Sequence, residues 1–336
     1  MTSQKITAKE RKRILHSYTQ ILQSNYVFQE KVEKAISFLE ENLDSGAYNN
    51  INDKVEFIHL INSDCDKIIH DTHLEVIYNP TFASSLINPK VDEEEQSSIW
   101  DRKEAANKNF GFEKLVILKG NIGYIKLRTF YPPDIGAGEV AVHAMNFFSN
   151  CKALIFDLRE NSGGEPEMVQ FLTTYLFPEE KGTFLLNRVY RRPSNHYDEF
   201  WTFPYVPGKR LADLDIFILI NHNTVSAAEE FAYNLQNLKR ATLVGETTRG
   251  GGHMVDYKAL DEDFIIQIPI GRAVNPITKT NWENVGVQPD IEAPPDKALL
   301  TAHLKALETL IKKSKTKSEQ QFLELELKTL KSSVKL

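Results

Sequence analysis

The segment IFILINHNTVSAAEEFAYNLQNL, residues 216–238, joins a short apolar run to an amphipathic pattern. The run over residues 216–220 has the length and apolar character of a buried strand. Apolar residues after Ser226 recur at helical spacing, so we expect a helix over residues 227–238. A buried strand that leads into a helix is the repeating unit of α/β cores.

The same alternation extends along the chain on both sides of this segment. The further runs that we interpret as strands are residues 115–118, 122–127, 153–158, 242–244 and 264–268. Helical patterns fall between them, near residues 140–148 and 166–177. Apolar strands alternating with helices are typical of sheets buried on both faces, and the sequence therefore predicts an α/β fold here.

The N-terminal part has a different pattern. Apolar residues between positions 14 and 69 recur at helical spacing, which predicts three amphipathic helices. We expect an N-terminal helical domain, a linker with an acidic run, an α/β core and a C-terminal helical tail. Their boundaries are residues 1–80, 81–109, 110–300 and 301–336.

Composition limits the functions that the chain can have. The formal net charge of -6 argues against a nucleic-acid partner, since a basic surface is missing. Cys65 and Cys151 lack the spacing of a zinc site and are expected to be buried free thiols. No segment has the roughly 20 apolar residues of a membrane span. The chain as written is expected to be cytoplasmic, or periplasmic or exported if a signal peptide was removed.

Ser226 has two interpretations. At a strand-to-helix junction, a serine hydroxyl lies near free backbone N–H groups that stabilise a developing oxyanion, which suits a nucleophile. Ser226 and Glu229 also fit the S-x-x-E capping box, which needs no catalytic role.

Two glycine-rich stretches are further candidates for a site. Gly163 and Gly164 follow the apolar run that ends at Leu158, where they suit either an oxyanion hole bordering a cleft or a tight turn. The stretch GETTRGGGH, residues 245–253, lacks the pattern of a nucleotide-binding loop. We expect it to pass close to a substrate.

Four ordered segments resemble the family of tail-specific serine proteases and interphotoreceptor retinoid-binding proteins. They are NFGFEKLVILKGNIGYIKL (109–127), LIFDLRENSGG (154–164), TVSAAEEFAYNLQNLKRATLVGETTRGGGH (224–253) and IPIGRAVNPITKTNWENVGVQPDIE (268–292). The helical region ending in HDTHLEV, residues 70–76, is similar to the N-terminal domain of the bacterial retinoid-binding-protein-like branch. Together these matches cover most of the chain.

The resemblance implies a fold and several site residues. The implied core is a crotonase/Clp-protease-like spiral of sheets and helices without a PDZ domain, and it would follow an N-terminal three-helix domain. By position, Ser226 matches the nucleophile, while Gly164 and the N–H of Ala227 match the oxyanion-hole donors. Glu283 matches the acidic residue that supports the catalytic site in the related tricorn core protease.

The general base is where the sequence departs from the family. Tail-specific proteases have a lysine in the loop after the nucleophile helix, and Gly251 occupies the matching position. Tricorn-type enzymes use a strand histidine, and Lys126 occupies that position. A lysine of lowered pKa can accept a serine proton, but Lys126 also fits a solvated or ion-paired strand residue.

Two histidines are further candidates. His253 ends the glycine-rich loop and is the second candidate base, with an ordinary surface histidine as the alternative. His73, with His70 and Asp71 nearby in sequence, has the spacing of a metal pair but no further ligand cluster. We therefore expect no metal, and a structural His73 that borders the cleft.

These observations predict a serine peptidase that acts on peptide or protein substrates. Ser226 would attack the carbonyl, Lys126 or His253 would accept the proton, and Glu283 would orient or neutralise the base. No cofactor is required. The rival prediction is a non-catalytic binding module for a retinoid, fatty acid or peptide, in which aromatic residues between positions 200 and 205 would line an apolar cleft.

Overall fold

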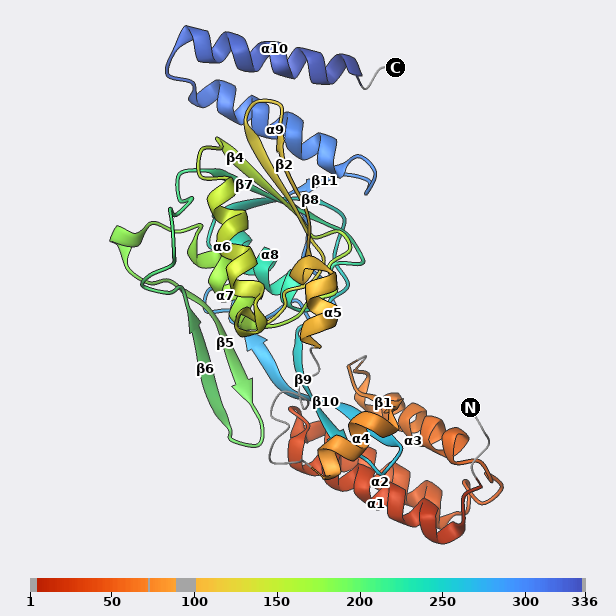
Figure 1. The fold of residues 1–336 in the computed structure, drawn as a ribbon. Helices are drawn as coiled ribbons and strands as arrows, with labels where there is room; N and C mark the ends of the chain where they lie inside the picture. Colours follow the sequence, from red (N-terminus) through yellow and green to blue (C-terminus); the bar gives the residue numbers. More distant parts are fainter. Residues whose placement is uncertain (1–4, 72, 89–100, 334–336) are drawn as a thin grey trace. The chain divides into compact units, whose positions relative to one another are not determined.

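The computed structural model describes residues 5–71, 73–88 and 101–333 (Figure 1). The chain divides into two compact units, and each unit combines segments that are distant in sequence. Unit 1 comprises residues 1–99, 189–198 and 253–273. Unit 2 comprises residues 100–188, 199–252 and 274–336.

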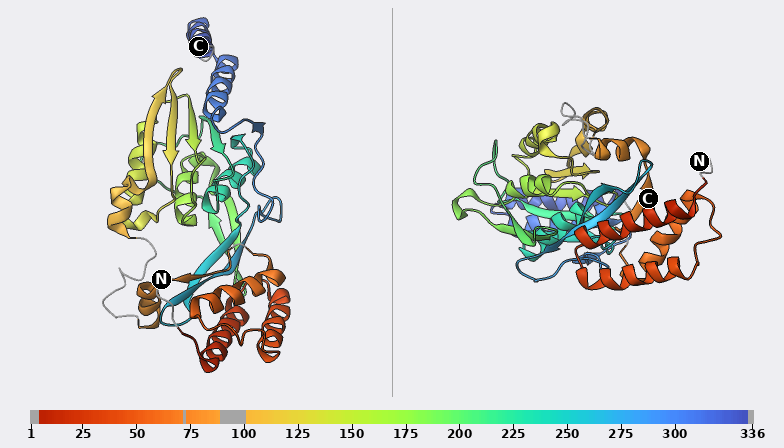
Figure 2. Two further views of the ribbon diagram at one scale, coloured as in Figure 1. Left: turned by 90° about the vertical axis from the view of Figure 1, so that its right-hand side faces the viewer. Right: turned by 90° about the horizontal axis from the view of Figure 1, so that it is seen from below.

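Unit 1 begins with three amphipathic helices, α1 (Ala8–Asn25), α2 (Gln29–Asp44) and α3 (Lys54–Ile69). Figure 2 shows α1 and α2 side by side. Thr7 and Glu10 form a capping box at the start of α1, and the Asp53 side chain caps α3. The apolar faces of all three helices pack into one core.

A sheet completes this core. Its strands run in the order β1 (Glu75–Tyr78), β10 (Phe264–Val274), β5 (Leu185–Arg191) and β6 (His196–Trp201), and β9 (His253–Ala259) also pairs with β10. Both β1 and β9 are antiparallel to β10. Apolar residues of β1 and β10 join the helical core, so unit 1 requires chain from residues 253–273 as well as the N-terminal helices.

Unit 2 is built on a six-stranded sheet. The strand order is β11 (Ile291–Glu292), β8 (Ala241–Gly245), β7 (Asp215–Ile220), β4 (Ala153–Asp157), β3 (Ile122–Leu127) and β2 (Phe112–Leu118). All neighbours are parallel except the edge pair of β2 and β3. Parallel strands end at the same edge, so the loops that follow β4, β7 and β8 begin close together.

Helices cover both faces of this sheet (Figure 1). On one face, α9 (Ala298–Lys313) buries apolar residues against β3, β4, β7 and β8, and α10 (Lys317–Ser333) packs on α9. On the other face, Phe231 of α8 (Ala227–Asn237) contacts Phe156 of β4. The helix α7 (Pro166–Thr174) packs against α8, and α6 (Ala137–Phe147) packs against α7. The fold is mixed α/β.

Several short elements lie outside the sequence-based expectations. The segment expected to be a linker contains α4 (Pro80–Ile87) and α5 (Arg102–Asn107), which begin at side-chain caps on Asn79 and Asp101. Six or eight residues are too few for a period to emerge, and the caps provide the local signal. The acidic run at residues 92–95 is outside the described residues. Short 3₁₀ helices occur at Asn109–Gly111, Pro133–Ile135 and Glu179–Lys181.

The structure also bears on the two cysteines and on membrane-spanning helices. Cys65 and Cys151 are both buried free thiols. Across residues 5–71, 73–88 and 101–333, we find no helix with the length and apolar character needed to cross a bilayer.

The helix α8 carries a buried carboxyl group on Glu230. Glu230 is 8 % exposed, and its Oε1 accepts hydrogen bonds from the amide groups of Asn187 (3.1 Å) and Asn234 (3.4 Å). Burial raises the pKa of Glu230 to about 7, assisted by the charge of Glu167 and opposed by the two amide hydrogen bonds. Deprotonation therefore costs the folded state more than the unfolded state.

We predict that Glu230→Gln increases the stability of unit 2 relative to the wild type, and that this increase is larger at high pH than at low pH. The folded-state pKa lies above the ordinary value of 4.5, so the wild type loses stability as pH rises from about 4.5 through 7. The amide oxygen of Gln retains both hydrogen bonds but does not ionise. The gain at pH 8 over pH 5 is expected to be about 2–3 kcal/mol in urea unfolding. A pH-independent difference between variant and wild type would contradict this.

Candidate active site

Ser226 has an unusual backbone conformation at the start of α8. Its φ of 59° and ψ of -123° lie outside the extended region that a capping serine normally adopts. A non-glycine residue in this region carries strain of about 1–3 kcal/mol, and such residues concentrate at functional sites. The Glu229 carboxylate accepts a hydrogen bond from the Ser226 N–H at 2.8 Å. Ser226 and Glu229 thus form the expected capping-box pair, but the backbone of Ser226 is strained.

The glycine pair lies against this serine. A Cβ added to Gly163, whose φ is 94°, would be 2.7 Å from the Cβ of Ser226 and 3.2 Å from its Oγ. Backbone contact continues on either side, because the Val225 N–H donates to the Asn161 carbonyl at 3.2 Å. The Asn161 side chain in turn accepts from the Gly163 N–H at 2.8 Å. The structure therefore brings the glycine pair after β4 and the serine after β7 together.

Gly164 and Ala227 provide the two backbone N–H groups expected to form an oxyanion hole. A Cβ on Gly164 would lie 2.2 Å from the Phe130 carbonyl oxygen, so only glycine fits this approach. Ala227 is the first residue of α8, where helical N–H groups have no intrahelical acceptor. Within the described ranges, neither N–H donates a hydrogen bond to another protein group. Both donors remain available to a ligand.

The second glycine-rich stretch forms a loop that Glu229 holds beside Ser226. The buried Glu229 carboxylate accepts hydrogen bonds from the N–H groups of Gly250 (2.6 Å) and Gly251 (2.8 Å), as well as from the Thr248 hydroxyl. Gly251, at the position where the family has a lysine, thus contributes a backbone hydrogen bond. Together with the Ser226 N–H, four donors converge on one carboxylate.

Glu283 lies on the other side of this loop. Its carboxylate accepts a hydrogen bond from the Gly252 N–H at 2.5 Å. The neighbouring Trp282 indole donates to the Gly251 carbonyl at 2.9 Å, and the Asn284 N–H donates to Gly250 at 2.9 Å. Glu283 therefore supports the loop immediately before His253.

Lys126 is an ion-paired strand residue. Its ammonium group lies 3.1 Å from the Glu113 carboxylate and 3.8 Å from that of Glu160. Arg128 pairs with the same two carboxylates, so four charged side chains form one network along β3 and its neighbours. An ion-paired strand lysine was one of the two interpretations of Lys126 stated from the sequence.

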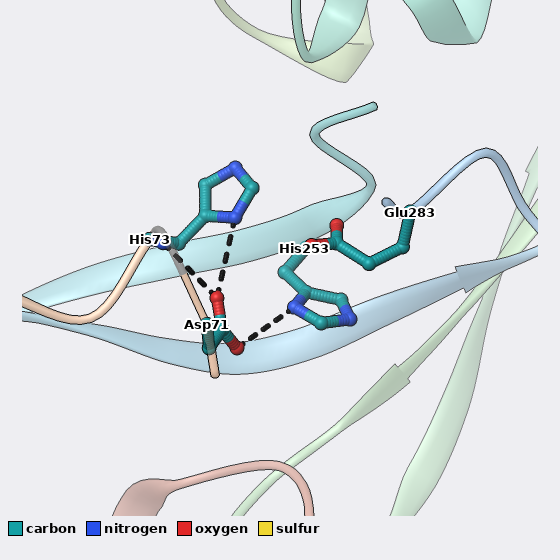
Figure 3. Close-up of side chains that lie close together, drawn as sticks. All are labelled: Asp71, His73, His253 and Glu283. Carbon is teal, nitrogen blue, oxygen red and sulfur yellow. Dashed lines mark hydrogen bonds and ion pairs between the residues drawn. The ribbon is translucent and has the colours of Figure 1, made fainter. Parts of the chain in front are cut away.

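His253 lies in unit 1, where it pairs with Asp71 (Figure 3). Its Nδ1 is 3.0 Å from Asp71 Oδ2, and both side chains are buried. His73 lies beside the same carboxylate, with Nδ1 3.4 Å from Asp71 Oδ1, and the two imidazole centroids are 5.8 Å apart. The structure thus brings His73 and His253 together although they are 180 positions apart in the sequence.

Asp71 is well suited to orienting an imidazole. It also accepts hydrogen bonds from the Tyr26 hydroxyl at 2.8 Å and from the His73 N–H at 3.0 Å. Burial alone raises the pKa of a carboxyl, but hydrogen bonds from His253 and His73 outweigh it and hold the pKa of Asp71 well below its ordinary value. An ionised carboxylate on Nδ1 leaves Nε2 of the imidazole as the proton acceptor.

Asp71, His73 and His253 are also residue types that bind metal ions. Each Asp71 oxygen, however, already receives a protein hydrogen bond from Tyr26 or the His73 backbone besides its imidazole neighbour. These contacts form a hydrogen-bonded cluster, and His253 is a further metal-ligating residue type that sequence spacing alone did not bring to His73.

Two residues of these clusters were not among the catalytic candidates expected from the sequence. Glu229 looked like the acidic half of a capping box, and its contacts with the glycine loop span 21 and 22 residues. Asp71 looked like part of a local histidine group, whereas its partner His253 is 182 residues away. For Glu229, the only sequence signal was an S-x-x-E motif followed by a glycine-rich loop. For Asp71, the only signal was the HDTH segment, residues 70–73.

Two family models match the chain between residues 3 and 293, apart from residues 114–120. The model for peptidase family S41 matches residues 121–293, just over half of the chain. The model for the N-terminal domain of peptidase S41 in eukaryotic IRBP matches residues 3–113. The chain belongs to peptidase family S41. The family expected from the sequence is confirmed.

Curated relatives match the α/β region. A chloroplastic carboxyl-terminal-processing peptidase 2 of Arabidopsis thaliana is 32 % identical over 52 % of this chain and 32 % of its own length. A tail-specific protease of Haemophilus influenzae is 30 % identical over 56 % of this chain and 24 % of its own. The matched segment thus spans about a third or less of these relatives.

Solved structures of other proteins are similar to this chain in fold over most of its length. Mature CPAF complexed with lactacystin has a TM-score of 0.58 at 12 % identity, covering 94 % of this chain and 99 % of that one. A photosystem II D1 C-terminal processing protease has a TM-score of 0.56 at 13 % identity, covering 87 % and 94 %. At these identities the similarity concerns the fold.

We predict that Gly163→Ala destabilises unit 2 and disturbs Ser226. The methyl group would approach the Ser226 Cβ to 2.7 Å at a φ of 94°, and contact plus strain should cost about 2–4 kcal/mol in thermal or urea unfolding. Gly182→Ala is the matched control, because its φ of 74° is also positive but no atom lies within 4 Å of the added Cβ. Equal losses in both variants would exclude a specific contact with Ser226.

Proposed function

We propose that this chain is a serine peptidase in which Ser226 attacks a peptide carbonyl carbon. The observation that carries the proposal is the strained Ser226 at the start of α8, packed against Gly163. Backbone N–H groups of Gly164 and Ala227 would stabilise the negative oxygen of the tetrahedral intermediate. The substrate class is a peptide or protein, as the family membership suggests.

Proton transfer is assigned to His253. As Ser226 Oγ bonds to the carbonyl carbon, its proton passes to Nε2 of His253, and Asp71 stabilises the imidazolium. The proton then goes to the leaving amine as the C–N bond breaks. Water attacks the resulting ester by the same route and releases the acid, which restores Ser226.

Chain connectivity supports this choice of base. The Ser226 N–H and the Gly251 N–H bond the same Glu229 oxygen, each at 2.8 Å. His253 follows Gly251 by two residues, a path of at most about 8 Å between Cα atoms. Glu283 holds the intervening Gly252 and would position this path. Lys126 is the less favoured base because two carboxylates already engage its ammonium group.

The finer architecture is also a proposal. We assign residues 110–300 to a crotonase/Clp-protease-like peptidase core, residues 1–80 to a three-helix domain, 81–109 to a linker and 301–336 to a helical tail. The parallel order of β3, β4, β7, β8 and β11 supports the core assignment. Segments at 189–198 and 253–273, grouped with the N-terminal helices, would be excursions from that core. The compartment, cytoplasmic or exported, stays a prediction.

Ser226→Ala is expected to abolish peptide cleavage, because it removes the attacking oxygen. The measurement is turnover of a mixed peptide library, together with covalent labelling by a fluorophosphonate probe. Wild-type protein should label at Ser226 and the variant should not. Saturable binding of a retinoid or fatty acid by a wild-type protein that neither cleaves nor labels would favour the binding-module alternative.

The base is tested by comparing His253→Gln, His73→Gln and Lys126→Met in the same assays. Loss of general-base catalysis should lower kcat by about 100- to 10,000-fold in His253→Gln. Lys126→Met should retain near-wild-type turnover, because its ion pairs only connect surface carboxylates. A collapse of kcat confined to His73→Gln or to Lys126→Met would transfer the role to that residue.

A further inference from the structure

We propose that Glu229 is a positioning residue for the peptidase reaction, through a buried carboxylate that holds the nucleophile and the glycine loop in one arrangement. This inference rests on the proposed function of Ser226. It assigns a role to a side chain that the sequence explains fully as the acidic half of a helix cap.

The contacts of Glu229 exceed what a helix cap requires. The side chain is 0 % exposed, and each oxygen accepts two hydrogen bonds. Oε2 accepts from the N–H groups of Ser226 and Gly251, while Oε1 accepts from the Gly250 N–H and the Thr248 hydroxyl. Only the Ser226 contact is local, so the other three connect α8 to the loop after β8.

The same contacts constrain the groups that the proposed reaction uses. The bond to the Ser226 N–H constrains the residue whose φ of 59° places its side chain against Gly163. It also constrains the adjacent peptide, which carries the Ala227 N–H. The two glycine contacts constrain the start of the path to His253. Displacements of about 1 Å in such elements can lower rates by 100-fold without direct contact with substrate.

The next residue on the helix supplies a matched control. Glu230 is also buried, but both of its hydrogen bonds, from Asn187 and Asn234, end on the same atom, Oε1. The amide oxygen of a glutamine can replace that acceptor. At Glu229, one of the two oxygens would become an NH₂ group facing two donors, which leaves those donors without an acceptor. Replacement of these neighbouring carboxylates by glutamine should therefore impair activity at Glu229 and leave it nearly unchanged at Glu230.

The experiment compares Glu229→Gln and Glu230→Gln in the full chain. Fluorophosphonate labelling of Ser226 and kcat should fall by about 100-fold in Glu229→Gln with little change in KM, while Glu230→Gln stays near wild type. Circular dichroism and thermal melting establish that both variants are folded. Wild-type labelling and kcat in a folded Glu229→Gln would overturn the inference.

Two further outcomes can be distinguished from a failure of the positioning role. If the wild type neither labels nor cleaves, the proposed function fails, independently of Glu229. If Glu229→Gln does not fold, Thr248→Val and Thr248→Ser decide, because only the first removes the hydroxyl that donates to Glu229. Slower labelling in Thr248→Val than in Thr248→Ser supports the positioning role, and equal rates in the folded pair overturn it.

Discussion

The candidate site depends on the close approach of two backbone segments, the glycine pair after β4 and the serine after β7. Gly163 has no Cβ, and this absence leaves the space that the Ser226 side chain occupies. Parallel pairing of β4 with β7 brings the two segments to the same edge of the sheet. A side chain at position 163 would separate them, so the absence of a single methyl group allows Ser226 to lie against the glycine pair.

Buried carboxylates bind the polar groups of the clusters described above. Glu229 accepts hydrogen bonds from four donors of Ser226 and the glycine loop, and Asp71 lies in contact with two histidines and a tyrosine. A buried charge is tolerated only when hydrogen bonds compensate its lost hydration, so each carboxylate dictates where its donors lie. Burial raises the pKa of Glu230 to about 7, because hydrogen bonds from two amide groups do not offset its lost hydration.

Much of the local structure was readable from the sequence because it follows from periodicity. The strands β3, β4 and β7 and the helices α6, α7 and α8 fall where apolar runs and helical patterns predicted them. The hairpin of β5 and β6 was not anticipated, since residues 185–201 are rich in charged and polar residues and show no apolar run. The strand β9 was not anticipated either, because residues 253–259 show no apolar run. Pairing with β10, rather than local pattern, makes it a strand.

The sequence by itself determined the α/β alternation, the family resemblance, and the serine and glycine motifs, because these depend on residue order and spacing. Only the tertiary structure decided which polar groups meet. His253 pairs with Asp71 across 182 residues, Lys126 pairs with Glu113 and Glu160, and Glu229 joins Ser226 to Gly251. The physical reason is that hydrogen bonds and ion pairs act over a few ångströms in space, and distance along the chain carries no information about them.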